Sequence, residues 1–151
     1  MHLLIISIFK QHIYPIMIAV VASVDDFLNR IEHHQLDWDL KPAPGKWSAK
    51  EVIGHLIDSA QINLHRFVRC TYEDSFSLIY LQDEWVATQH YQTADIEDLL
   101  QLWRLLNLQI QRVLDNYPTD RWLATCNNHT VEFISHDYLA HMVHHLKSIT
   151  P

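Results

Sequence analysis

The stretch SAKEVIGHLIDSAQINLHRFVRC, residues 48–70, decides the fold that this sequence predicts. It opens with Ser48 and Glu51 at the spacing of a capping box, in which each side chain binds a backbone N–H of the first helical turn. Apolar residues then recur every three or four positions, which predicts a helix from about Ala49 to Cys70. Its inward face is expected to carry Val52, His55, Leu56, Ser59, Ile62, Arg66 and Phe67.

Three further amphipathic segments accompany this helix. The most regular one follows Thr93 or Asp95 and has apolar residues at 3–4 spacing. An earlier segment opens at Ser23, which forms a second possible capping box with Asp26, and the last one is expected to be capped by Ser135. Four amphipathic helices with long connections predict an all-α four-helix bundle.

The remaining segments are expected to be connections or an extension. Residues 1–22 contain two short apolar runs, and we expect an N-terminal extension or the start of the first helix there, with the bundle itself over 23–151. Neither run approaches the roughly 20 apolar residues of a membrane span, and no basic segment precedes them as in a secretory signal. Prolines exclude a helix over 37–47. Residues 71–92 predict a long loop with one short helical turn near 83–87, and loops this long in compact domains are usually functional.

Composition narrows the possible functions. The formal net charge is −7 and the basic residues are scattered, which argues against a nucleic-acid partner. Cys70 and Cys126 do not have the spacing of a disulfide framework or a metal knuckle, so free thiols in a reducing cytoplasm are expected. Histidine is the outlier, with 12 in the chain.

Histidines cluster in the last predicted helix. His141 and His145 are four residues apart and lie one above the other on a helical face. His144 competes with His145, but the i,i+4 pair is preferred because its angular offset is smaller. Taken alone, such a pair is more often a partly exposed surface feature. A catalytic metal site of this kind uses three protein ligands and leaves one position for water. His55, on the inward face of the 49–70 helix, is the expected third ligand, although a lone core histidine is more often simply hydrogen-bonded.

Several polar residues accompany these histidines. Asp58 lies one turn after His55, and we expect its carboxylate to orient that imidazole, with a solvated helix-face charge as the alternative. Burying three neutral imidazoles without partners would be costly, which favours a metal site over chance. No nucleophile elbow, phosphate loop or paired cysteine motif is present in the sequence.

Two segments resemble the DinB/YfiT-like superfamily: KPAPGKWSAKEVIGHLID at 41–58 and AHMVHHLK at 140–147. The segment LQDEWV at 81–86 is similar to the Gln-Asp-aromatic loop of that family, and Arg66 stands where members often carry an arginine. The resemblance spans about residues 24–149, and its first block is the specific part. The apolar start of the chain departs from the usual polar start of the family.

The resemblance implies a four-helix bundle that binds a divalent metal, usually zinc or nickel, and that commonly forms a homodimer. The family's ligand positions fall on His55, His141 and His145. Relatives include bacillithiol S-transferases and the mycothiol-dependent maleylpyruvate isomerase, and many others are regarded as metal-dependent hydrolases.

The expected function is therefore a cytoplasmic metal-dependent enzyme for a small-molecule substrate, without a nucleic-acid or membrane partner. It would be a hydrolase or a low-molecular-weight-thiol S-transferase, with water or thiol at the open metal position as the reactive group. Gln82, Asp83 and Trp85 are candidates for the substrate side, and Arg66 for a carboxylate of the thiol or for an ion pair on its helix. The alternatives are a non-catalytic metal-binding or stress-response bundle, and a helical interaction module without metal.

Overall fold

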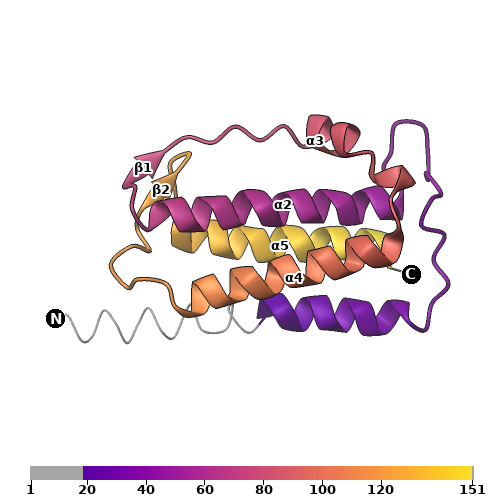
Figure 1. Cartoon of the computed structure of the whole chain (residues 1–151), viewed down its shortest axis with the longest axis horizontal. Helices are drawn as coiled ribbons and strands as arrows, with labels where there is room; N and C mark the ends of the chain where they lie inside the picture. Colours follow the sequence, from indigo (N-terminus) through magenta and orange to yellow (C-terminus); the bar gives the residue numbers. More distant parts are fainter. Residues whose placement is uncertain (1–18, 151) are drawn as a thin grey trace.

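Long helices lying side by side form the body of the molecule in the computed structural model, which describes residues 19–150 (Figure 1). These are a first helix described over residues 19–31, then α2 (Ala49–Cys70), α4 (Ile96–Asp115) and α5 (Val131–Ile149). The predicted all-α bundle of four helices is confirmed. No helix within the described range is long and apolar enough to cross a membrane.

Helix α2 is the central element, and its predicted bounds are confirmed. The capping box is formed, since the Ser48 hydroxyl accepts from the Glu51 amide at 3.2 Å and the Glu51 carboxylate accepts from the Ser48 amide at 2.8 Å. Every residue from 52 to 60 is buried, because α4, α5 and α3 all pack against this helix. Arg66 is half-buried at its far end. The first half of α2 therefore lies in the interior of the molecule.

The core joins apolar residues of all four long helices. Phe27 of the first helix meets Trp103 of α4 edge to face, with ring centroids 5.8 Å apart. Such aromatic pairs add a specific geometry to the apolar area that they bury. The fully buried large side chains are Val20, Val24, Phe27, Ile53, Leu56, Ile57, Phe67, Trp103, Ile110, Leu114 and Met142, together with His55.

The first helix begins earlier than Ser23. Residues 19–22 are already helical, and Val20 is fully buried, so Ser23 lies inside the helix and is not its cap. The expected capping box with Asp26 is wrong because the apolar periodicity of the core extends upstream of Ser23. The rest of the segment 1–22, residues 1–18, lies outside the described residues.

The last helix also begins earlier than expected, at Val131 and not after Ser135. Its cap is Thr130, whose hydroxyl accepts from the Phe133 amide at 3.2 Å. Ser135 is buried inside α5 and donates to the carbonyl of Glu132 at 2.7 Å. The cap prediction is therefore wrong, because threonine and serine are both good caps and the sequence offers one of each.

A small three-stranded sheet, which the sequence did not predict, closes one end of the bundle. Its order is β1 (Ser75–Phe76), β2 (Thr125–Cys126) and β3 (His129–Thr130), with the first pair parallel and the second antiparallel. Asn127 and Asn128 turn the hairpin with φ of 50° and 64°, a left-handed backbone that asparagine tolerates. The sheet holds the start of the long connection against the chain that leads into α5.

Residues 77–93, here called the strap, run along the outer side of α2 between the sheet and α4 (Figure 1). The strap contains α3 (Gln82–Gln89) and a short 3-10 helix, η1 (Tyr91–Thr93). The helical turn expected near 83–87 is confirmed and extends to the longer α3. Asp95 then caps α4 by accepting from the amides of Glu97 and Asp98.

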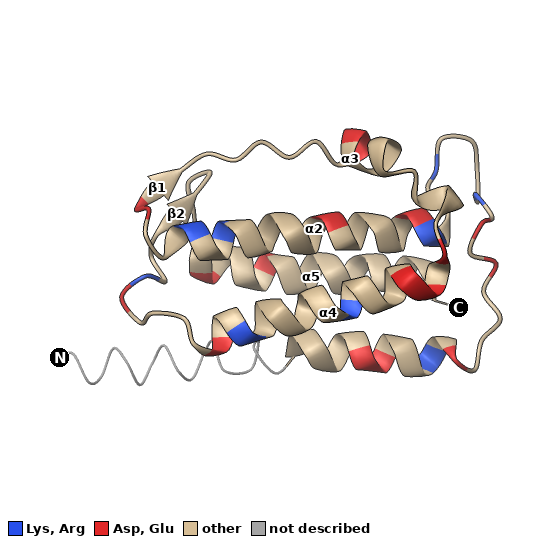
Figure 2. Ribbon diagram, in the orientation of Figure 1, with Lys and Arg blue, Asp and Glu red and all other residues tan. Residues whose placement is uncertain are grey.

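Charged residues are distributed along the whole bundle. Figure 2 shows Lys and Arg on several different elements, with no single element carrying them all. Several of these cations form ion pairs, as with Lys41 and Glu51 at 2.8 Å, and Arg69 and Glu73 at 2.7 Å.

Candidate metal centre

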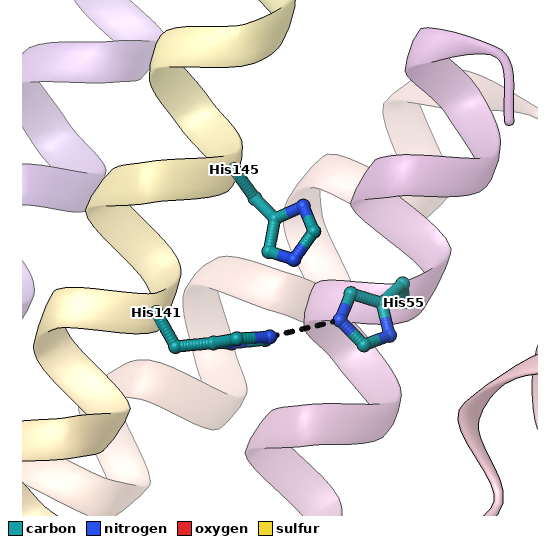
Figure 3. Close-up of side chains that lie close together, drawn as sticks. All are labelled: His55, His141 and His145. Carbon is teal, nitrogen blue, oxygen red and sulfur yellow. Dashed lines mark hydrogen bonds between the residues drawn. The ribbon is translucent and has the colours of Figure 1, made fainter. Parts of the chain in front are cut away.

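Three histidine side chains meet between α2 and α5 (Figure 3). His55 comes from the second turn of α2, while His141 and His145 come from successive turns of α5. One ring nitrogen of each lies within 4.8 Å of the other two, and the Nε2 atoms of His55 and His141 are 3.1 Å apart. The fold thus brings together the three histidines that the sequence singled out.

Helical geometry explains this meeting. The i,i+4 spacing stacks His141 and His145 on one face of α5, with ring centroids 4.6 Å apart. His55 lies on the part of α2 that is buried all round, and its ring centroid is 5.0 Å from that of His141 and 4.8 Å from that of His145. His144 is exposed, and its ring lies against that of His145 with centroids 5.4 Å apart. Its one-residue offset therefore removes it from the cluster.

The three rings are held in their neutral form. Burial, followed by the like charges of the other two rings, lowers the pKa of His55 to about 3. Burial also lowers the pKa of His145 to about 4, and it lowers the pKa of His141 below its usual range. Neutral imidazole is the form that donates a lone pair to a metal ion. The cluster is therefore in its ligating state at neutral pH.

The donor set fits a divalent transition-metal ion. Imidazole nitrogens suit zinc, nickel, cobalt, copper and iron, whereas magnesium and calcium prefer oxygen ligands. Asp58, one turn after His55, is bound to Gln89 and Tyr91 and not to the cluster. The Nε2 atoms of His55 and His141 face each other, and a hydrogen bond between them uses only one proton. Three convergent, neutral and largely buried nitrogens are therefore better satisfied by a shared cation than by one another.

Tyr80 of the strap is a member of this site that sequence reasoning missed. Its hydroxyl lies 3.2 Å from Nδ1 of His55, and the two rings are nearly parallel at 11°. Trp85 of α3 packs edge to face on Tyr80 with centroids 5.5 Å apart, and Trp47 lies against the ring of His55 at 4.9 Å. Tyr80 stands in a stretch without periodicity, so no sequence signal pointed its side chain toward the histidines.

Asp58 does not orient His55 as predicted. Its Oδ1 accepts hydrogen bonds from the hydroxyl of Tyr91 at 2.6 Å and from the side-chain amide of Gln89 at 2.5 Å. Its Oδ2 is buried without a partner, and burial raises the pKa of the carboxyl group to about 6. The prediction failed because the strap, which has no counterpart in the helical pattern, supplies partners for both Asp58 and His55. Asp58 holds the end of the strap on α2.

The other candidate residues differ in their burial and in whether they contact the histidine site. Trp85 is half-buried and reaches the histidines through Tyr80, whereas Gln82 and Asp83 are exposed in the first turn of α3. Arg66 donates to Asn63 at 3.3 Å, its Nε is buried without a partner, and no acidic residue between 19 and 150 forms an ion pair with it. The alternative of an ion pair on its own helix is therefore not found in the described chain.

The two cysteines are buried and free. Burial raises the pKa of the Cys70 thiol to about 11 and raises that of Cys126 as well. A thiol is nucleophilic as its thiolate, which these surroundings disfavour. The two thiols are therefore poor candidates for a nucleophile, and the histidine cluster is the better candidate for a reactive centre.

Comparison with known proteins places the fold. A sequence model of the DinB superfamily matches residues 19–149. Among solved structures, the chain is similar to YfiT from Bacillus subtilis, described as a probable metal-dependent hydrolase with an unusual four-helix bundle topology. The two share 21% sequence identity at a TM-score of 0.83, and the match covers 93% of this chain and 85% of the other. That likeness shows the fold alone. No curated protein matches the chain.

Proposed function

The chain belongs to the DinB superfamily, and from this premise we propose that it is a metal-dependent enzyme whose divalent ion is held by His55, His141 and His145. One observation carries the proposal: three neutral ring nitrogens from two helices, one buried and two half-buried, lie within 4.8 Å of one another. The description of YfiT as a probable metal-dependent hydrolase agrees with this assignment.

A bound divalent ion would supply a Lewis acid that lowers the pKa of a water or thiol at its remaining position. The protein's own residues set the conditions for that chemistry. The three imidazoles are uncharged, so they would leave the positive charge of the ion undiminished. His55 is fully buried beneath Trp47, whereas His141 and His145 are half-buried. We therefore expect substrate to approach beside the two α5 histidines.

The proposed reaction is hydrolysis of a small molecule or transfer of a low-molecular-weight thiol to an electrophile. Arg66 lies eleven residues after His55, which returns it to nearly the same face of α2. Its guanidinium, which has no ion-pair partner among the described residues, is proposed to meet a carboxylate of the thiol or substrate, as such groups suit bidentate carboxylate binding. Trp85, with the more exposed Gln82 and Asp83, is proposed to line the substrate side of the strap.

Three further properties are proposed from the usual behaviour of the family. The ion is zinc or nickel, because neutral imidazoles suit both. The protein works as a homodimer, and it works in the cytoplasm. Native mass spectrometry of the purified protein tests the first two together, since it reports subunit number and bound metal mass.

Metal analysis tests the ligand assignment. Untagged protein, purified without added metal, is expected to contain one divalent ion per chain. His55→Ala and His145→Ala should each reduce that content to a small fraction. His144→Ala is the matched control, because it removes an exposed histidine next to the cluster and should retain the ion. Stoichiometric metal in His55→Ala or His145→Ala protein would overturn the assignment.

A turnover assay tests whether the site is catalytic. Metal-loaded protein, chelator-stripped protein and the His55→Ala variant are incubated with a panel of esters, amides and epoxides, with and without low-molecular-weight thiols. Hydrolysis predicts turnover without thiol, whereas S-transfer predicts turnover only with thiol. The same rate in loaded and stripped protein across the panel would contradict an enzymatic role.

One alternative is favoured by a specific observation. The donors come from two different helices, so an ion would cross-link α2 to α5 even if it performed no chemistry. A non-catalytic metal-binding or stress-response bundle predicts stoichiometric metal, a large gain in stability and no turnover. A helical interaction module without metal also predicts no turnover, but it predicts neither bound metal nor a gain in stability on adding metal.

A further inference from the structure

We propose that Tyr80 is a positioning residue for His55: its hydroxyl binds Nδ1 of the imidazole and so presents Nε2 to the other two histidines. The proposal rests on the proposed metal site only for its effect on metal affinity. The contact itself is a property of the protein fold, and it can be tested without metal.

The geometry of the His55 ring supports this role. Its two nitrogens face different parts of the molecule, since Nε2 lies 3.1 Å from Nε2 of His141 while Nδ1 lies 3.2 Å from the Tyr80 hydroxyl. The Tyr80 and His55 rings are nearly parallel, inclined by 11° with centroids 6.4 Å apart. The hydroxyl at 3.2 Å is within hydrogen-bond distance of Nδ1.

A histidine that binds metal through one nitrogen must carry its proton on the other. The partner of that second nitrogen fixes the tautomer and the orientation of the ring. A phenol oxygen can accept a hydrogen bond from Nδ1–H, which leaves the lone pair of Nε2 facing the cluster. Carboxylates often play this part, but Asp58 is already bound to Gln89 and Tyr91. Tyr80 is therefore the group at Nδ1.

The strap holds Tyr80 from both sides. Before it, the side chain of Asn127 donates to the carbonyl of Leu78 at 2.9 Å and accepts from its amide at 2.8 Å. After it, Asp58 binds Gln89 and Tyr91, and Trp85 packs against the Tyr80 ring. The hydroxyl is thus placed by a segment tied at each end, so the position of the strap and the orientation of His55 are linked.

Tyr80→Phe is the direct test, because it removes one oxygen and keeps the ring against Trp85. Loss of a group that orients a metal-bound histidine typically weakens metal binding about 10- to 100-fold. Competition with a chelator should show a loss in this range for Tyr80→Phe. Tyr72→Phe is the matched control, since Tyr72 is 67% exposed and its variant should bind metal as the wild type does. The absorption bands of cobalt-loaded protein should shift only in Tyr80→Phe.

A second measurement uses metal-free protein and nitrogen NMR of the His55 ring. Wild-type protein should show His55 protonated at Nδ1, and Tyr80→Phe should show a mixture of tautomers. Protonation of wild-type His55 at Nε2 would overturn the proposal, as would unchanged tautomer, affinity and cobalt spectrum in Tyr80→Phe. If the wild type binds no metal, the proposed function fails, while the tautomer of the wild-type protein still decides the role of Tyr80.

Discussion

At the scale of single residues, burial drives several titratable groups in the interior of the bundle toward their neutral forms, His55 and Asp58 among them. The pKa of His55 is lowered to about 3 and that of Asp58 is raised to about 6, in both cases mainly by desolvation. The effects on folding stability have opposite signs. A buried histidine loses stability as the pH falls, whereas a buried carboxyl group loses stability as the pH rises.

We predict that metal-free protein is destabilised by mild acid through His55. Below pH 6.5 the unfolded chain protonates this histidine, whereas the folded protein resists protonation until about pH 3. The contribution is therefore complete above pH 6.5 and is lost as the pH falls, by on the order of 3 kcal/mol between pH 6.5 and pH 4. Urea unfolding at several pH values measures it.

His55→Gln is the control for this pH dependence. Other groups, including Asp58, titrate in the same range in both proteins, so the difference between the two unfolding free energies isolates His55. The wild type should lose stability relative to His55→Gln as the pH falls. A difference that stays constant from pH 7 to pH 4 would contradict the prediction.

The residues of the candidate site differ in whether the sequence alone could predict their positions. His55, His141 and His145 could be grouped because helical periodicity assigns each to a face, and the structure brings their rings together. Tyr80 and the partners of Asp58 could not be assigned in this way. They depend on the strap, whose path over α2 follows from tertiary contacts and not from any repeat in its own sequence.

At the scale of elements, the strap packs closely against α2 at Gly54. A Cβ atom at this position would lie 2.1 Å from Cδ2 of Tyr91, a buried ring that also donates to Asp58. Glycine inside a helix is normally unfavourable by about 1 kcal/mol relative to alanine. Here the missing side chain lets η1 approach the helix, which places both the strap and Tyr80.

Gly54→Ala is therefore expected to destabilise the protein by about 2–3 kcal/mol, despite the gain in helix propensity, because the ring of Tyr91 must move. Chemical denaturation measures the change. In a Tyr91→Ala background the obstructing ring is absent, so the same glycine substitution should be neutral or stabilising. A gain in stability on Gly54→Ala with Tyr91 intact would show that the contact is not restrictive.

The start of α5 gives a second prediction at this scale. Thr130→Ala removes the side chain that caps the helix and should cost about 1 kcal/mol of unfolding free energy. Ser135→Ala is the comparison, because Ser135 donates within the helix to a carbonyl and caps nothing. We expect it to cost under about 0.5 kcal/mol. If Ser135→Ala lowered the unfolding free energy as much as Thr130→Ala or more, the helix cap would be Ser135, as the sequence suggested.

Elements differ in how well the sequence predicts them. Helix α2 has a capping box at one end and a regular apolar face, and both of its predicted ends are correct. Helix α5 lacks a unique cap signal, and its start was misplaced. The strands of the sheet are two residues long each, which is too short for any alternation to be visible. They exist because distant segments pair, not because their own sequence favours strands.

At the scale of the whole molecule, the proposed ion would join helices that the backbone connects only through a long path. Free energy gained by binding the folded state alone grows with ligand concentration, reaching about 2.7 kcal/mol at 100 times Kd. For a domain of this size, that corresponds to a rise in Tm of roughly 5–10 °C. Thermal unfolding with added zinc or nickel, against unfolding with excess chelator, tests this.

The control for the Tm shift is again a pair of neighbouring variants. His144→Ala should keep the full shift, because its ring is outside the cluster. His145→Ala should melt at the same temperature with metal and with chelator. An equal shift in both variants would mean that the ion stabilises the protein from some other position.

The distance in sequence between the histidines has a consequence for how the protein is made. His55 and His141 are separated by 86 positions. At roughly 5–20 residues per second, a ribosome would finish α2 several seconds before it began α5. During that interval a nascent chain holds one donor of three and cannot compete for an ion. Metal loading would therefore follow synthesis of α5, and metal content would distinguish chains that carry this helix from chains that end before it.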